Sequence, residues 1–227
     1  MVSIEAVIDS NFRKDLGSLI GIAIAAALLA AGESRPQGQA LQPQLEGQKL
    51  VEALRKGGLV ILMRHMSTDS LAPAEGTHND QDCASQRNLD EHGRQTARNV
   101  GAAVESLGIP IGLVLTSPYC RCIDTGKLAF GKGTVSEDLA AFDEVSGAEK
   151  ESKAKLVRKL LNTAPTDGSN TVLITHTGTL LYTFGLQTRP EGIAHVFRPA
   201  DFGNAIYLGR VTPEEWPVLA GSASPES

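Results

Sequence analysis

The sequence predicts an α/β fold, in which a mostly parallel central sheet has helices on both faces. Short all-apolar segments, such as LVILM at 59–63, have the pattern of strands that are covered on both faces. Segments with the helical spacing of apolar residues alternate with these strands along the chain. Hydrophobic residues make up 41% of the 227-residue chain and charged residues 21%, as in an ordinary globular domain.

Each expected element follows from a local pattern. In 45–58, apolar residues recur on one helical face until two glycines end the helix. The stretch 67–88 is polar and irregular, and a loop of this length in a compact domain is usually functional or disordered. The expected strands are 59–63, 111–118, 170–178 and a pair near the sheet edge within 195–213. The expected helices are 45–58, 89–108, 119–131, 150–165 and one directly after 178.

The first forty residues differ from the rest. The run 16–32 is apolar apart from one serine, follows a short charged region and precedes a polar, Gln- and Pro-rich stretch. This pattern is typical of a secretory signal. We therefore expect residues 1–40 to be a signal peptide or N-terminal anchor with a short linker, and 41–227 to be one domain. A cleaved chain would begin at Glu33 or Leu41 and be periplasmic or secreted; an anchored domain outside the cytoplasm is the alternative.

Charge and cysteine content limit the partners. A formal net charge of -5 argues against a nucleic-acid surface, so affinity for an anion must come from a local cluster of arginines. Membrane contact is expected only through the N-terminal segment, if it is uncleaved. Cys83, Cys120 and Cys122 do not have the spacing of a zinc site.

Three expected strand ends carry chemically unusual residues. Arg64 and His65 end the first strand, the second leads to Arg121, and the third ends at His176. In parallel sheets the carboxyl ends of the strands meet at one edge, where ligands bind. A neutral imidazole attacks phosphorus, while guanidinium groups and a second, protonated histidine bind phosphoryl oxygens. The pattern predicts a site for a small phosphorylated substrate.

The segments RHMSTD (64–69), LDEHGRQTA (89–97), SPYCRCIDTG (117–126) and VLITHTG (172–178) resemble the histidine phosphatase superfamily, also called phosphoglycerate-mutase-like. The resemblance covers about 59–185 and is to a small exported member. It implies a three-layer sandwich and a phosphohistidine mechanism without a metal ion or organic cofactor. Met66 stands where the family has glycine, and Gly126 where it usually has alanine.

The resemblance also implies roles for individual residues. His65 would be the nucleophile, and an acid after the second arginine would protonate the leaving group. The residues implied to bind the phosphate are Arg64, Arg121, His176 and Thr68, and His176 is also implied to be catalytic. The implied acid is Glu144 or, alternatively, Asp143. His78, His92 and His195 are expected at the surface or at helix caps.

These expectations define a metal-independent phosphomonoester hydrolase acting on an extracytoplasmic phosphorylated sugar or similar small molecule. A phosphohistidine-protein phosphatase and a non-catalytic phosphate-binding module on the same fold remain alternatives. Cys120 precedes the phosphate-binding Arg121 at the rim of the site, and Cys83 lies in the loop that crosses that rim. Cys122 occupies a small-residue position in the following helix. We therefore expect a Cys83–Cys120 disulfide.

Overall fold

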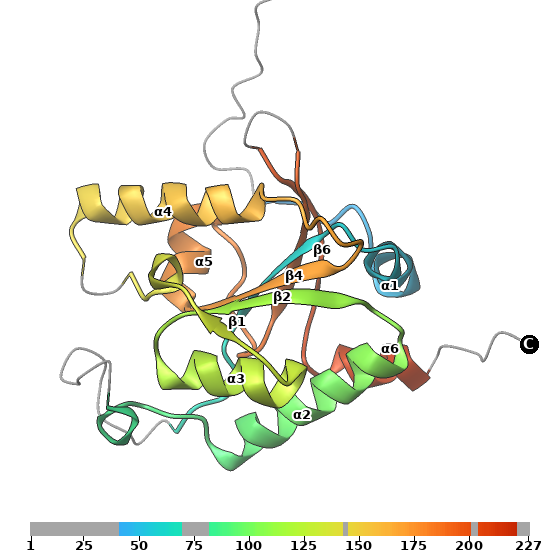
Figure 1. The fold of residues 1–227 in the computed structure, drawn as a ribbon, viewed down its shortest axis with the longest axis horizontal. Coiled ribbons are helices and arrows are strands. Elements are labelled where there is room, and N and C mark those ends of the chain that lie inside the picture. The colour runs from blue at the N-terminus through green and yellow to red at the C-terminus, as the bar shows by residue number, and fades with distance from the viewer. Residues whose placement is uncertain (1–40, 70–81, 143–144, 201–203, 222–227) are drawn as a thin grey trace, which may run out of the picture. The chain divides into compact units, whose positions relative to one another are not determined.

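The computed structural model describes residues 41–69, 82–142, 145–200 and 204–221 (Figure 1). The segment expected to be a signal or anchor, 1–40, lies outside the described residues. Among those that are described, no helix is both long and apolar enough to cross a membrane.

A six-stranded sheet in the order β3-β2-β4-β1-β5-β6 forms the centre of the fold. The strands are β1 (Val60–Arg64), β2 (Ile111–Thr116), β3 (Thr134–Val135), β4 (Asn170–Thr175), β5 (Ala194–Arg198) and β6 (Ile206–Val211). Strands β3, β2, β4 and β1 run parallel, whereas β5 and β6 are antiparallel to their neighbours. The mostly parallel sheet with a strand pair at its edge confirms the predicted fold class.

Helices cover both faces of the sheet, and Figure 1 shows α2, α3 and α6 on the side opposite α4 and α5. The helices are α1 (Gly47–Arg55), α2 (Glu91–Ser106), α3 (Cys120–Phe130), α4 (Gly147–Leu161), α5 (Thr177–Phe184) and α6 (Glu215–Gly221). The short strand β3 and the helix α6 were not anticipated, because two residues and seven residues are too few for a periodic pattern to stand out.

Two hydrophobic cores lie on the two faces, and the alternation of side chains along β1 supplies both. Ile61 and Met63 join the core that includes residues of α1, α2, α3 and α6. Val60 and Leu62 join the core that includes residues of α4 and α5. All five residues of β1 are buried, which is the pattern expected from its unbroken apolar run.

The register of the parallel strands brings their carboxyl ends to one level. Arg64 pairs with Thr175, and Thr116 pairs with Ile174. The residues that follow these strands are therefore neighbours at the same edge of the sheet. Helices α3 and α5 begin directly beyond this edge, so their first turns face the same place as the strand ends.

Candidate active site

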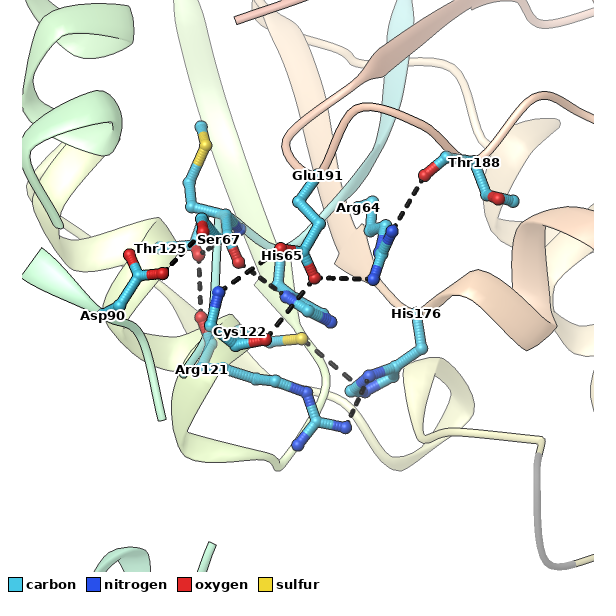
Figure 2. Close-up of polar contacts among 12 residues, drawn as sticks. Arg64, His65, Ser67, Asp90, Arg121, Cys122, Thr125, His176, Thr188 and Glu191 are labelled. Atoms are coloured by element: carbon cyan, nitrogen blue, oxygen red, sulfur yellow. Dashed lines mark hydrogen bonds and ion pairs between the residues drawn. The ribbon is translucent and has the colours of Figure 1, made fainter. Parts of the chain in front are cut away.

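His65 and His176 meet at this edge, with ring centroids 5.5 Å apart. Both side chains are buried, and the N–H of His65 donates to the carbonyl of Thr175 at 3.1 Å, which locks the ends of β1 and β4 together. Figure 2 shows the two imidazoles with Arg64 and Arg121 around them. The predicted meeting of the three strand ends is confirmed.

The ring of His65 is held in one tautomer by the backbone. Its Nδ1 lies 2.8 Å from the carbonyl oxygen of Met66, and because a carbonyl only accepts, Nδ1 must carry the proton. Nε2 therefore keeps its lone pair. Burial, and then the charge of Arg121, lower the pKa of His65 well below 6.5, so the ring is neutral at neutral pH. A neutral imidazole with Nε2 unprotonated is the form that attacks phosphorus.

His176 takes the opposite tautomer. A guanidinium only donates, so Nη2 of Arg121, at 3.1 Å, donates to Nδ1 of His176. Nε2 of the neutral ring then carries the proton and donates to Oγ of Ser117 at 2.7 Å. The Arg121 side chain is fully buried and its guanidinium carbon lies 4.6 Å from the centre of the Tyr119 ring.

The pKa values of the two histidines are shifted in the same direction in the free site, whereas the protonated His176 that we expect belongs to the site with phosphate bound and stays a prediction. Burial, followed by Arg121, lowers the pKa of His176 well below 6.5, as it does for His65. The physical reason is that both rings are buried and that arginines, Arg121 above all, already supply positive charge beside them. A dianionic phosphate is the charge that would favour protonation of His176.

Backbone contacts fix the position of the strand end. The N–H of Met66 donates to Oγ1 of Thr125 at 3.1 Å, and that hydroxyl donates to the carbonyl of Arg121 at 2.7 Å. Thr125 in helix α3 therefore ties the nucleophile's neighbour to the residue that carries the second arginine. The sequence motif contains this threonine, but its role depends on contacts 59 residues apart.

Arg64 and Thr68 lie beside a carboxylate that sequence reasoning missed. Nη1 of Arg64 donates to the carbonyl of Thr188 at 3.0 Å, and Nη2 donates to Oε1 of Glu191 at 2.6 Å. The backbone N and Oγ1 of Thr68 each lie 3.4 Å from an oxygen of Glu191. Thr68 is therefore at the site, as expected. A lone glutamate in a loop carries no sequence signal, so Glu191 could not have been singled out.

The candidate acid Glu144 and its alternative Asp143 lie outside the described residues. The residue before them, Phe142, is buried and packs its ring against Tyr182 of α5. Within the described part of the chain, no group of three or more His, Cys, Asp or Glu is arranged to hold a metal ion.

The disulfide prediction is confirmed. Cys83 and Cys120 are bonded across 37 positions, with their Cα atoms 5.7 Å apart. The N–H of Cys120 also donates to Oε1 of Gln86 at 2.9 Å, a second tie between the loop and α3. Cys122 is a buried thiol whose sulfur lies 3.6 Å from Nε2 of His176.

The remaining histidines have different environments. His92 is exposed in the first turn of α2, and His78 lies outside the described residues. The expectation that His195 is a surface or cap residue was wrong, since it is buried in β5. Its Nε2 lies 2.8 Å from the carbonyl of Gln187 and its Nδ1 lies 3.2 Å from the hydroxyl of Tyr207. A loop carbonyl and a hydroxyl from β6 satisfy both ring nitrogens, which is why burial is tolerated.

Comparison with known proteins gives one family match and several similar solved structures. The model of the histidine phosphatase superfamily (branch 1) matches residues 60–166. The chain is similar to phosphoserine phosphatase from Entamoeba histolytica (15% identity, TM-score 0.50, covering 70% of this chain and 98% of that one). It is also similar to ecdysone phosphate phosphatase from Bombix mori (16% identity, TM-score 0.50, 62% and 89%). No curated protein matches the chain.

The fold is therefore the histidine phosphatase fold, a six-stranded sheet flanked by helices. The family match covers just under half of the chain and is a similarity to the histidine phosphatase superfamily (branch 1). The matched range contains Arg64, His65, Thr68 and Arg121 and ends before His176. The second histidine joins the site through the pairing of β4 with β1.

Proposed function

We propose that this chain is a phosphomonoester hydrolase in which His65 forms a phosphohistidine intermediate. The observation that carries the proposal is the hydrogen bond from Nδ1 of His65 to the Met66 carbonyl, which leaves Nε2 able to attack. Arg64 and Arg121 lie around the pair of imidazoles and can donate to phosphoryl oxygens, and His176 becomes a further donor when a bound phosphate favours its protonation. A module that only binds phosphate has no need of a nucleophile held in this tautomer.

The reaction takes place in two displacements. Nε2 of His65 attacks phosphorus, an N–P bond forms, and the bond from phosphorus to the leaving oxygen breaks. Glu144 is the acid that we propose to protonate the departing alcohol, with Asp143 as the alternative. Its carboxylate then takes a proton from water, which attacks phosphorus and breaks the N–P bond. Inorganic phosphate leaves and His65 returns to its neutral state. The arginines stabilise the charge on the phosphoryl oxygens in both steps.

We further propose that the substrate is a small phosphorylated molecule outside the cytoplasm, such as a phosphorylated sugar. The Cys83–Cys120 disulfide supports an oxidising compartment, because structural disulfides are rare in the cytosol. It also ties Cys83, in the described segment 82–88, to the first residue of α3, beside Arg121. A segment fastened beside the site favours a small molecule over a folded phosphoprotein.

Trapping the intermediate tests the proposal. Acid-labile, base-stable phosphate should appear on His65 when the enzyme is quenched during turnover of an aryl phosphate without added metal, and mass spectrometry of peptides locates it. His65→Ala should lose all turnover, because no other group is placed to accept the phosphoryl group. His92→Ala, which changes an exposed histidine, is the matched control and should keep full activity. An adduct on another residue, or an active His65→Ala, would refute the mechanism.

A further inference from the structure

Glu191 contacts donors of two residues expected to bind phosphate, Arg64 and Thr68. Its carboxylate accepts from Nη2 of Arg64 at 2.6 Å and lies 3.4 Å from both the backbone N and the hydroxyl of Thr68. Figure 2 shows the Glu191 side chain directed at Arg64 beside the His65 strand end. In the free site, a carboxylate of the chain itself therefore makes the contacts that phosphoryl oxygens would make.

The backbone holds Glu191 in this place. The N–H of Gly192 donates to the carbonyl of His65 at 2.9 Å, and the N–H of Arg64 donates to the carbonyl of Ile193 at 3.1 Å. Gly192 has a φ of +85°, and a Cβ there would come within 2.4 Å of the sulfur of Met66. The chain thus approaches the strand end as closely as only glycine permits. Glu191 is fixed at the edge of the site by its neighbours rather than placed there by a surface rotamer.

Burial explains why the free site needs this carboxylate. The side chains of Arg64 and Glu191 are 6% and 16% exposed, so the ion pair is largely closed to water. An arginine that is buried without a counter-charge is costly, and the carboxylate removes that cost when no phosphate is present. A dianionic phosphate would neutralise the same guanidinium. Two anions would then compete for one set of donors at short range.

We infer that Glu191 is a built-in competitor of phosphate. Its carboxylate holds the side chains of Arg64 and Thr68 in their binding positions in the empty site, and it weakens the binding of every phosphate ligand. This inference rests on the phosphate site proposed above. The Arg64 and Thr68 hydrogen bonds transfer from the carboxylate to phosphoryl oxygens when ligand binds. The same competition favours departure of inorganic phosphate after each turnover, so it limits product inhibition.

Direct binding of inorganic phosphate tests the inference without requiring turnover. Titration calorimetry should show that Glu191→Gln binds phosphate about tenfold more tightly than the wild type, since the amide keeps an acceptor for Arg64 but removes the negative charge. The inhibition constant of phosphate against aryl phosphate hydrolysis should fall by the same factor. Glu105→Gln removes an exposed carboxylate in the last turn of α2. It should leave the dissociation constant and the inhibition constant of phosphate unchanged.

Thermal unfolding supplies a second readout. Without phosphate, Glu191→Gln should melt at a lower temperature than the wild type, because Arg64 loses its counter-charge. Saturating phosphate should raise the melting temperature of the variant by more than that of the wild type, in proportion to its tighter binding. Circular dichroism confirms that the variant is folded before either comparison is made.

The outcomes separate the competing explanations. Unchanged or weaker phosphate binding by folded Glu191→Gln overturns the inference. Weaker binding would show that Glu191 merely positions Arg64. A loss of turnover confined to alkyl phosphates, with the affinity for phosphate unchanged, would show that Glu191 is the leaving-group acid. Tighter binding in a protein that never forms phosphohistidine would refute the phosphatase and leave the competitor in place. Absence of phosphate binding by both proteins would refute the two proposals together.

Discussion

At the scale of single residues, the chemistry of this site is set by which nitrogen of each imidazole carries the proton. The carbonyl of Met66 holds the proton on Nδ1 of His65, whereas the guanidinium of Arg121 keeps the proton off Nδ1 of His176. One ring therefore presents a lone pair and the other accepts a cation's hydrogen bond. The same residue type performs two tasks because its partners differ.

Nuclear magnetic resonance of the imidazole nitrogens can check this assignment. Burial and Arg121 lower the pKa of both His65 and His176, so both rings should remain neutral when the free enzyme is brought from pH 7.5 to pH 6. Long-range proton–nitrogen spectra should show the Nδ1–H tautomer for His65 and the Nε2–H tautomer for His176. Arg121→Met should move both titrations to higher pH, because it removes the second-largest cause of the lowered pKa values.

A charged imidazole in either residue at pH 6 would contradict the assignment, and so would a proton on Nε2 of His65. The direction of the pKa shift of His65 matters for catalysis. A nucleophile with a lowered pKa is active over the whole neutral range and is lost only when the pH falls through that lowered value.

At the scale of elements, three helices begin beside the strand ends. Asp90 caps α2 by accepting from the N–H of Gly93, and it also accepts from the hydroxyl of Ser67 at 2.7 Å. A Cβ on Gly93 would lie 2.1 Å from the carbonyl oxygen of Ser67, so only glycine allows this approach. Helices α3 and α5 begin beside Arg121 and His176, and their positive ends favour an anion there.

The disulfide between Cys83 and Cys120 fastens the start of α3 covalently to the segment before α2. It closes a loop of 37 positions, for which the chain-entropy model gives a stabilisation of about 4 kcal/mol. The double variant Cys83→Ser/Cys120→Ser should therefore lose about 3–4 kcal/mol of unfolding free energy in urea titrations without reductant. The physical reason is the larger freedom of its unfolded chain.

Reductant provides the control for this prediction. At a dithiothreitol concentration that reduces the disulfide of the wild type, the difference in unfolding free energy between the two proteins should largely vanish. Alkylation of Cys83 in unreduced native protein would show instead that the bond is absent from the folded enzyme.

At the scale of the whole molecule, the sheet joins two cores and contains a buried histidine in β5, one of its two antiparallel strands. His195 lies in β5 opposite Leu62 of β1, and Gln187 and Tyr207 complete its hydrogen bonds. Burial lowers its pKa to about 4. The neutral ring is thus part of the folded state, and protonation opposes folding.

This histidine should make stability depend on pH in a defined window. In the unfolded chain a histidine takes up its proton near pH 6.5, whereas the folded protein resists until about pH 4. The contribution of His195 is therefore complete above pH 6.5 and is lost progressively as the pH falls toward 4. Between pH 7.5 and pH 5 the loss should be about 2 kcal/mol, measured by urea unfolding.

The variant His195→Gln isolates this contribution. Glutamine can donate to the Gln187 carbonyl but does not titrate, so its unfolding free energy should fall less over the same pH interval. Other groups, including His65 and His176, titrate in both proteins and cancel in the comparison. Equal losses in the two proteins would show that His195 is protonated in the fold or accessible to water.

Much of the fold was determined by the sequence alone, because its signals are local. Apolar runs and helical spacing defined five of the helices and the strands β1, β2 and β4, with boundaries that differ from the observed ones by a few residues. The position of Arg64, His65, Arg121 and His176 also followed from local patterns. Parallel strands bring their carboxyl ends to one edge, so residues at those ends must meet.

Only the tertiary structure decided the hydrogen-bond partners, tautomers and pKa values of these residues. The ion pair of Arg64 with Glu191 joins positions 127 apart, and the hydrogen bond of Met66 to Thr125 joins positions 59 apart. No periodic pattern encodes such contacts, because each depends on where two segments far apart in the sequence come together. The burial of His195 has the same origin: β5 lies between β1 and β6 and is covered by neighbours that the local sequence does not contain. Residue types and their approximate places are local properties, whereas protonation, tautomer and competition for phosphate depend on the assembled sheet.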